Sequence, residues 1–318
     1  MTPPPVITPP ASKHAVPNPR FPFIDGPDGA ARATCRPEDV QLIRLWMKRQ
    51  PHLPVISDAF ITLFLHSVYN SIEQAKATIE TYFSARTAAP EFFKNRDCFS
   101  QDVQFSYKTV HLTSLNQTTP EGYRVLLCRL SDHEPSHLHF SDVLKAFFMF
   151  ADICISEDGV IPGYITIFDL KGVMLGHLPR ISLPSLKKFM VYIQDAHPVR
   201  LKAVHLINCV PFMDKILAMV KPLMKNEMIN LLQLHSNGLD TLFKTIPEEI
   251  MPEDYGGKDK HTAELHADYK KLMETKYVDW LKEEDEQLRT NEDLRIGSKS
   301  TQSELFGMEG SFRKLAID

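Results

Sequence analysis

The chain has 318 residues, of which 43% are hydrophobic, so it can form one large domain and a smaller one. Its formal net charge is −4, from 36 Lys and Arg against 40 Asp and Glu. Because no long block of one sign is present, the charge pattern excludes the strongly basic surface of a typical nucleic-acid-binding protein. We therefore expect no nucleic-acid partner.

The cysteines and the apolar segments indicate the compartment. The five cysteines are widely spaced and form no CxxC pair, which favours reduced thiols over a disulfide framework or a zinc knuckle. The first thirty residues contain nine prolines and no apolar run behind a basic start, so no secretory signal is expected. The longest apolar segment, residues 143–155, is interrupted by Lys145 and Asp152 and is too short to span a bilayer. These features predict a cytoplasmic protein.

Two N-terminal regions precede the main domain. Residues 1–33 are rich in proline and cannot bury enough surface to offset their ordering entropy, so we expect a disordered arm. In residues 34–96, apolar side chains recur at three- and four-residue spacing, with Pro37, Ser57 and Ser71 at the expected helix starts. This pattern predicts a small helical domain.

Residues 97–288 alternate between β-rich runs and helical patterns. The expected strands are 123–130, 164–170, 203–208 and 230–236. The expected helices are 140–155, 183–195, 211–225 and 262–287. Such alternation is typical of a mostly parallel sheet with crossover helices, so the predicted fold class is α/β.

The C-terminal segment, residues 289–318, begins polar and ends apolar. Its apolar side chains are too numerous for a free tail, so we expect the segment to dock on the main domain. These side chains are Leu305, Phe306, Phe312, Leu315 and Ile317.

The sequence contains no convincing catalytic or metal-binding motif. "HEPSH", His133–His137, matches the zinc-protease pattern HExxH, but that site needs a continuous helix, which Pro135 would break. "HTAELH" at 261–266 has the wrong glutamate spacing. No GxGxxG, GxxxxGK[ST] or GxSxG motif occurs. We therefore expect no metal, no cofactor and no enzymatic activity.

The most distinctive element is the helix predicted at 211–225, which has a broad apolar stripe. Pro211 suits its first turn, whereas Pro222 should kink its far end. The pattern is typical of ordinary core, and it also suits the wall of a binding site, since its methionines can repack around different contents.

Three blocks of sequence carry a family resemblance: "GYITIFDLKG" (163–172), "HPVRLKAVHLINCVPFMDKILAMVKPLM" (197–224) and "IPEEIMPEDYGG" (246–257). Their order and spacing resemble the CRAL-TRIO lipid-transfer family, in particular the branch of alpha-tocopherol transfer protein and cellular retinaldehyde-binding protein. The helical block and the ending "ELFGMEGSFRKLAID" are similar to the family's N-terminal domain and to insect members of the branch. The resemblance covers about residues 35–285.

The resemblance implies an α/β bowl in which the sheet is the floor of a closed apolar lipid cavity and the helix after "HLIN" is a hinged lid. It also implies a set of ligand-binding side chains. These are Phe147, Phe150, Ala151, Cys154, Tyr164, Thr166, Phe168, Leu175, Ile181, Phe189, Ile193, Val204, Phe212, Ile216, Met219, Val220 and Leu223.

The phosphoinositide-binding members of this branch carry a basic cluster near the lid. Arg200 and Lys202 match that cluster, whereas the other equivalent positions are Val68, Met228 and Leu232. A full phosphate clamp is therefore not expected, although the remaining cations favour anionic lipid surfaces.

The hypothesis from the sequence is a monomeric, peripherally membrane-associated carrier of one hydrophobic small molecule, in the order retinoid, carotenoid or tocopherol-like isoprenoid. A polar handle for the ligand is expected at Tyr164, Thr166 or Tyr192. One alternative is a regulatory or scaffold module that senses a phospholipid or phosphoinositide. A lipid isomerase or hydrolase is a third possibility, and it would need His197 or His205 as its acid or base.

Overall fold

The computed structural model describes residues 35–236, 238–297 and 305–307. The expected disordered arm of residues 1–33, and Phe312, Leu315 and Ile317 of the C-terminal segment, lie outside this part of the chain. The described residues Leu305 and Phe306 pack on the main apolar cluster, where Phe306 is 1% exposed.

The described chain begins with four helices: α1 (Pro37–Met47), α2 (Asp58–Ser67), α3 (Ile72–Ala88) and α4 (Pro90–Phe93). Serine caps start α2 and α3, as the sequence predicts. The Ser57 hydroxyl accepts a hydrogen bond from the backbone N–H of Phe60 at 3.1 Å, and Ser71 caps α3 in the same way. Aromatic rings fill the space between α2 and α3: Phe60, Phe64, Tyr82 and Phe83.

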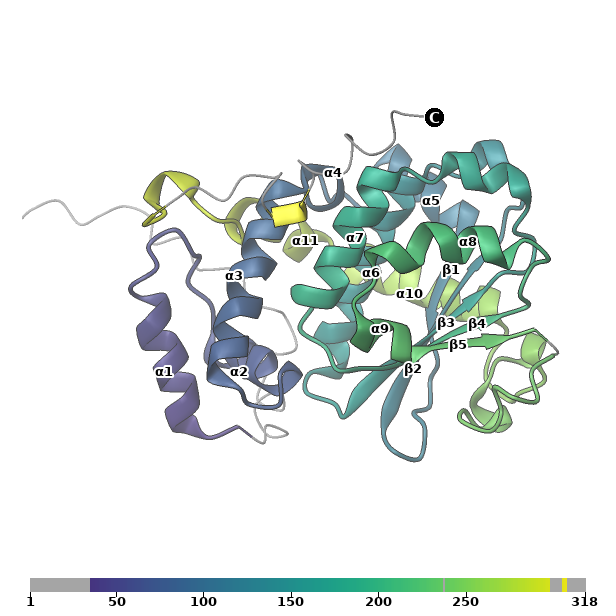
Figure 1. The fold of residues 1–318 in the computed structure, drawn as a ribbon, viewed down its shortest axis with the longest axis horizontal. Coiled ribbons are helices and arrows are strands. Elements are labelled where there is room, and N and C mark those ends of the chain that lie inside the picture. Colours follow the sequence, from purple (N-terminus) through teal and green to yellow (C-terminus); the bar gives the residue numbers. More distant parts are fainter. Residues whose placement is uncertain (1–34, 237, 298–304, 308–318) are drawn as a thin grey trace, which may run out of the picture.

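A five-stranded sheet forms the centre of the larger part of the molecule (Figure 1). The strands are β1 (Val110–Ser114), β2 (Tyr123–Leu130), β3 (Gly163–Asp169), β4 (Leu201–Ile207) and β5 (Leu232–His235). The order of the strands in the sheet is their order in the chain. Strands β2 to β5 are parallel to one another, whereas β1 is antiparallel to β2. Strand β1 directly follows helix α5 (Gln101–Thr109). The predicted α/β fold class is therefore confirmed, although β1 was not predicted.

Helices cover one face of the sheet. The segments that connect the parallel strands β2 to β5 contain the helices η1 (Pro135–His137), α6 (Phe140–Asp158), η2 (Leu175–Arg180), α7 (Leu183–Asp195), α8 (Met213–Val220), η3 (Lys221–Leu223) and α9 (Asn226–Leu231). Because the strands follow one another in sequence, right-handed crossovers place these connections on the same side. The kink expected at Pro222 appears as the change from α8 to η3.

The opposite face is covered by the segment after β5, which includes η4 (Glu248–Ile250), η5 (Glu253–Tyr255) and α10 (Thr262–Lys276). Side chains on β2 alternate between the two faces, as a pleated strand requires. Leu126 and Cys128 pack with α6, whereas Val125 and Leu127 pack with the segment after β5.

The helix predicted at 262–287 is two helices, because α10 ends before Tyr277 and α11 (Val278–Gln287) begins after it. The last short element is η6 (Glu292–Leu294). None of the helices in the described ranges is long and apolar enough to cross a membrane.

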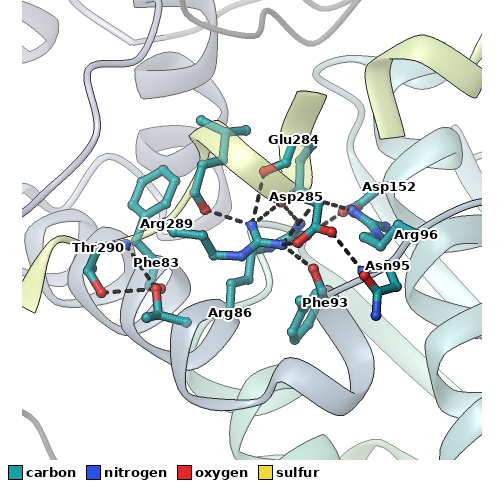
Figure 2. Close-up of polar contacts among 12 residues, drawn as sticks. Phe83, Arg86, Phe93, Asn95, Arg96, Asp152, Glu284, Asp285, Arg289 and Thr290 are labelled. Atoms are coloured by element: carbon teal, nitrogen blue, oxygen red, sulfur yellow. Dashed lines mark hydrogen bonds and ion pairs between the residues drawn. The ribbon is translucent and has the colours of Figure 1, made fainter. Parts of the chain in front are cut away.

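A buried ionic network joins α3, α6 and α11 (Figure 2). Arg86 on α3 lies 2.6 Å from Asp152 on α6 and 2.7 Å from Glu284 on α11, measured between nitrogen and oxygen. Arg96 pairs with the same two carboxylates, and these four side chains are at most 2% exposed. Arg289 adds a third cation 2.6 Å from Glu284. The network thus ties the N-terminal helices to the part of the molecule that contains the sheet.

A buried histidine pair predicts acid sensitivity. His205 on β4 is 0% exposed, and its Nδ1 lies 2.9 Å from Nε2 of His235 on β5. Burial, followed by the neighbouring His235, lowers the pKa of His205 to about 4. The stabilisation from the neutral ring is therefore complete above the ordinary pKa of 6.5 and is lost as the pH falls towards 4.

We expect the free energy of unfolding to decrease by on the order of 2 kcal/mol from pH 7 to pH 4 through this group. Urea titrations at several pH values would measure it. The His205→Leu variant should show a shallower decline, and the exposed His139→Leu control should follow the unmodified protein. Equal slopes for all three proteins would contradict this assignment.

Candidate functional site

An apolar cavity of about 270 Å³ lies between the helical face of the sheet and helices α6, α7 and α8. Its floor is β3, where Tyr164, Thr166 and Phe168 face the cavity and the alternating residues Ile165 and Ile167 face the opposite core. No Lys, Arg, Asp or Glu of the described chain lines it. The space therefore suits an uncharged, hydrophobic guest.

A register shift shapes the floor at β4. Tyr164 pairs with Leu201 and Ile165 pairs with Ala203, so Lys202 is left as an extra residue. Leu201 and Val204, three residues apart, consequently both face the cavity. Gly163 is required beside this bulge, because a Cβ there would lie 2.8 Å from the backbone oxygen of Arg200.

Most of the side chains that the family resemblance implied come together around this space. Those that line the cavity are Phe147, Ala151, Cys154, Tyr164, Thr166, Phe168, Phe189, Ile193, Val204, Ile216 and Val220. They come from α6, β3, α7, β4 and α8, so five separate elements converge on one site. Their role in binding a ligand remains a prediction.

Six of the expected residues do not line the cavity. Phe150 faces α10, with its ring centroid 5.2 Å from that of Tyr269, because α6 is packed on several sides. Leu175 is 51% exposed in η2. Phe212 is half-buried before the first turn of α8. The remaining three pack on the cluster of Leu186, Met190 and Met228 at the cavity's edge: Ile181, Met219 and Leu223.

The cavity also includes residues that the sequence reasoning missed. They are Leu126, Ile155, Leu170, Leu186, Met190, Val199, Leu201, Leu206, Leu217, Met224, Met228 and Leu232. Helical spacing from Phe189 could have indicated Leu186, and the same spacing from Ile193 could have indicated Met190. Strand alternation from Val204 could have indicated Leu206. Of the two histidines named as a candidate acid or base, His197, in the turn before β4, lines the cavity and His205 does not.

The three hydroxyl groups predicted to bind the polar end of the ligand, those of Tyr164, Thr166 and Tyr192, have different surroundings. The Tyr164 hydroxyl donates to Asp158 at 3.0 Å, and Asp158 pairs with Arg124 at 2.6 Å. Burial, reinforced by the Asp158 carboxylate, raises the pKa of Tyr164 well above its ordinary value. Tyr192 does not line the cavity, and its hydroxyl accepts a hydrogen bond from Arg86 at 2.9 Å. Thr166 lines the cavity, and none of the side-chain hydrogen bonds found in the described chain involves its hydroxyl.

The apolar stripe of α8 forms the outer wall. Met213 is the buried residue of this helix, whereas Ile216, Leu217 and Val220 are half-buried although they face inward. A helix that belonged to a solid core would bury this stripe completely, as α6 does. The partial burial indicates a cover over a hollow.

Arg200 and Lys202 lie outside the cavity, around the exposed ring of Tyr69. The Arg200 guanidinium is 4.1 Å from the ring centroid, and its Nε donates to the backbone oxygen of His66 at 2.7 Å. Lys202 Nζ donates to the Tyr69 hydroxyl at 3.0 Å. In the described chain, the hydrogen-bond partners of these two cations are thus a backbone oxygen and a tyrosine hydroxyl, not carboxylates. Met228 and Leu232, at other positions of the basic cluster, face the cavity instead.

The HExxH-like pentad does not form an α-helix. Pro135–His137 is a single 3₁₀ turn, and Nδ1 of His137 lies 2.7 Å from the Asp132 carboxylate. In the described ranges, no three His, Cys, Asp or Glu side chains are grouped to hold a metal ion.

Comparison with known proteins assigns the family. A family model described as "CRAL/TRIO domain" matches residues 108–257, which contain the whole sheet and the cavity. The chain is a CRAL/TRIO domain protein. A second model, described as "Pinta-like, UBA domain", matches residues 33–103, which contain α1 to α4. CRAL/TRIO proteins bind and transfer hydrophobic ligands and are generally not enzymes.

Two relatives show how far the similarity extends. Alpha-tocopherol transfer protein-like of Mus musculus is 31% identical over 226 residues, which are 70% of this chain and 65% of that protein. Clavesin-1 of Rattus norvegicus is 24% identical over 223 residues, 69% of this chain and 63% of that protein. The chain therefore spans slightly less than two thirds of the length of these relatives. A solved structure titled "Crystal structure of Sfh5" covers 77% of this chain and 99% of that chain at 11% identity, with a TM-score of 0.46.

Proposed function

We propose that this protein carries one hydrophobic small molecule, of the retinoid, carotenoid or tocopherol-like class, in the cavity beneath α8. The observation that carries the proposal is a cavity wall to which eight elements contribute and in which no charged side chain of the described chain takes part. The relative described as alpha-tocopherol transfer protein-like supports an isoprenoid ligand.

Burial of such a ligand in the cavity releases a large amount of free energy. Removing about 400 Å² of apolar ligand surface from water contributes roughly 10 kcal/mol before the entropy costs of binding. A ligand held this strongly leaves slowly unless the cavity opens. The half-buried stripe of α8 offers the route, since its apolar side chains can enter the interfacial layer of a membrane at little cost. In this proposal the protein releases its cargo at membranes through movement of α8.

Extraction of the purified protein with organic solvent, followed by mass spectrometry, tests this function. We expect close to one equivalent of a single lipid per chain. The scaffold alternative predicts a protein without lipid, and the phospholipid-sensing alternative predicts a phospholipid in the extract. Either result would contradict the proposed cargo class.

The half-buried cations Arg200 and Lys202, which lie outside the cavity, predict electrostatic attraction to membranes. A basic residue near an anionic surface contributes about 1 kcal/mol, so the Arg200→Gln and Lys202→Gln substitutions should each weaken vesicle binding about 5-fold. Sedimentation with phosphatidylserine-containing vesicles at low salt would measure the effect. Neutral phosphatidylcholine vesicles provide the control, with no difference expected. Unchanged binding to the anionic vesicles would show that this surface is not the contact.

A further inference from the structure

Two polar side chains, His197 and Thr166, line the largely apolar cavity, and a purely hydrophobic ligand would offer neither of them a hydrogen-bond partner. His197 lines the cavity, and within the described chain its Nε2 is buried without a hydrogen-bond partner. The Thr166 hydroxyl, on the floor of the same cavity, takes part in none of the side-chain hydrogen bonds found in the described chain. Tyr164 differs, because its hydroxyl is already bound to Asp158.

The position of His197 is well defined. Its backbone N–H donates to the oxygen of Tyr192 at 2.8 Å, and the two rings lie 5.9 Å apart between centroids. Tyr192 is in turn held by Arg86 of the buried ionic network. The imidazole therefore lies on a rigid support where the turn after α7 meets the cavity.

The cavity around His197 is electrically neutral. Burial lowers the pKa of His197 to about 4, so the ring is uncharged near pH 7 and offers one N–H donor and one nitrogen acceptor. Arg86 and Asp152, the nearest charges, are bound to each other at 2.6 Å and do not line the cavity. A carboxylate or phosphate in this space would lose its hydration without gaining a counter-charge.

We propose that His197, together with Thr166, selects a neutral lipid that carries a hydroxyl group at the end inserted into the cavity. A hydroxyl can donate and accept, so it can pair with the imidazole in either tautomer, and the same holds for a pairing with the threonine hydroxyl. This inference rests on the proposed function and specifies its cargo as an isoprenoid alcohol in preference to an acid or a hydrocarbon.

Three probes with the same prenyl chain test the inference: farnesol, farnesoic acid and farnesene. Titration of the lipid-free full chain at pH 7.5 should show farnesol binding at least 10-fold more tightly than the ionised acid. In His197→Phe, which keeps an aromatic ring beside Tyr192, farnesol should bind about 2- to 12-fold more weakly, as expected for one lost hydrogen bond. Farnesene should bind this variant and the unmodified protein equally.

Thr166→Val, which preserves the shape of the side chain, should also weaken farnesol alone. His139→Phe, on the surface, is the matched control and should change nothing. Equal binding of the three probes, or preference for the acid, would overturn the selection by His197 and leave the carrier function standing. Failure of all three probes to bind would overturn both. The ranking of probes on the unmodified protein does not depend on any variant folding.

Discussion

Replacing Phe189 by aspartate is expected to abolish ligand retention. Phe189 lines the cavity from α7, and its ring lies 5.6 Å between centroids from both Phe147 and Phe148. The substitution removes this contact and places a carboxylate where no cation of the described chain can pair with it. Since such a charge costs several kcal/mol, ligand affinity should fall by roughly 100-fold or more. Quantification of the lipid that copurifies with the variant would measure the loss.

Leu183→Asp is the matched control, because it introduces the same charge on the same helix at a position that is 51% exposed. We expect this variant to retain its lipid. Far-ultraviolet circular dichroism should show unchanged helix content in both variants, since both substitutions lie on α7 and leave the sequences of the N-terminal helices unchanged. A Phe189→Asp protein that keeps its ligand would contradict the cavity assignment.

Replacing Glu284 by glutamine is expected to destabilise the fold by about 3–5 kcal/mol. The substitution is isosteric, but it leaves Arg86 and Arg96 fully buried with Asp152 as their shared carboxylate. An uncompensated buried charge is more costly than the loss of a surface ion pair. The midpoint of urea denaturation at pH 7 would report the change.

The exposed neighbour Glu283 provides the control, and Glu283→Gln should change stability by less than about 0.5 kcal/mol. Burial alone would raise the pKa of Glu284, but the charges of Arg96, Arg289 and Arg86 outweigh it and hold the pKa well below its ordinary value. Its stabilising contribution is therefore present above pH 4.5 and is lost as the pH falls below that value. Equal stability of the two variants at pH 7 would rule out this role for the network.

Much of the fold could be predicted from the sequence, because the signals were local. The run at 123–130 is β2 to the residue, and Ser57 and Ser71 are helix caps. Strand β1 was not predicted because it follows α5 without a turn signal and because its five residues, "VHLTS", mix polar and apolar side chains. Its strand conformation comes from pairing with β2, which is not a local property.

The candidate site could be predicted only in part, because it depends on which face of each element points inward. On α6, Phe147, Ala151 and Cys154 face the cavity while Phe150 faces α10. That helix is apolar on nearly every side, so periodicity cannot choose between them. On β4, the extra residue Lys202 interrupts the alternation of side chains between the two faces of the sheet. Regular alternation from Val204 would therefore place Leu201 on the face opposite the cavity, whereas Leu201 lines the cavity.

The most direct test of the account is an experimental structure of the protein purified with its natural lipid. We expect continuous density for one elongated molecule between β3, β4 and α8, with a polar end near His197 and Thr166. Density that shows α8 collapsed onto the sheet, with side chains filling the space and no guest, would contradict the carrier function.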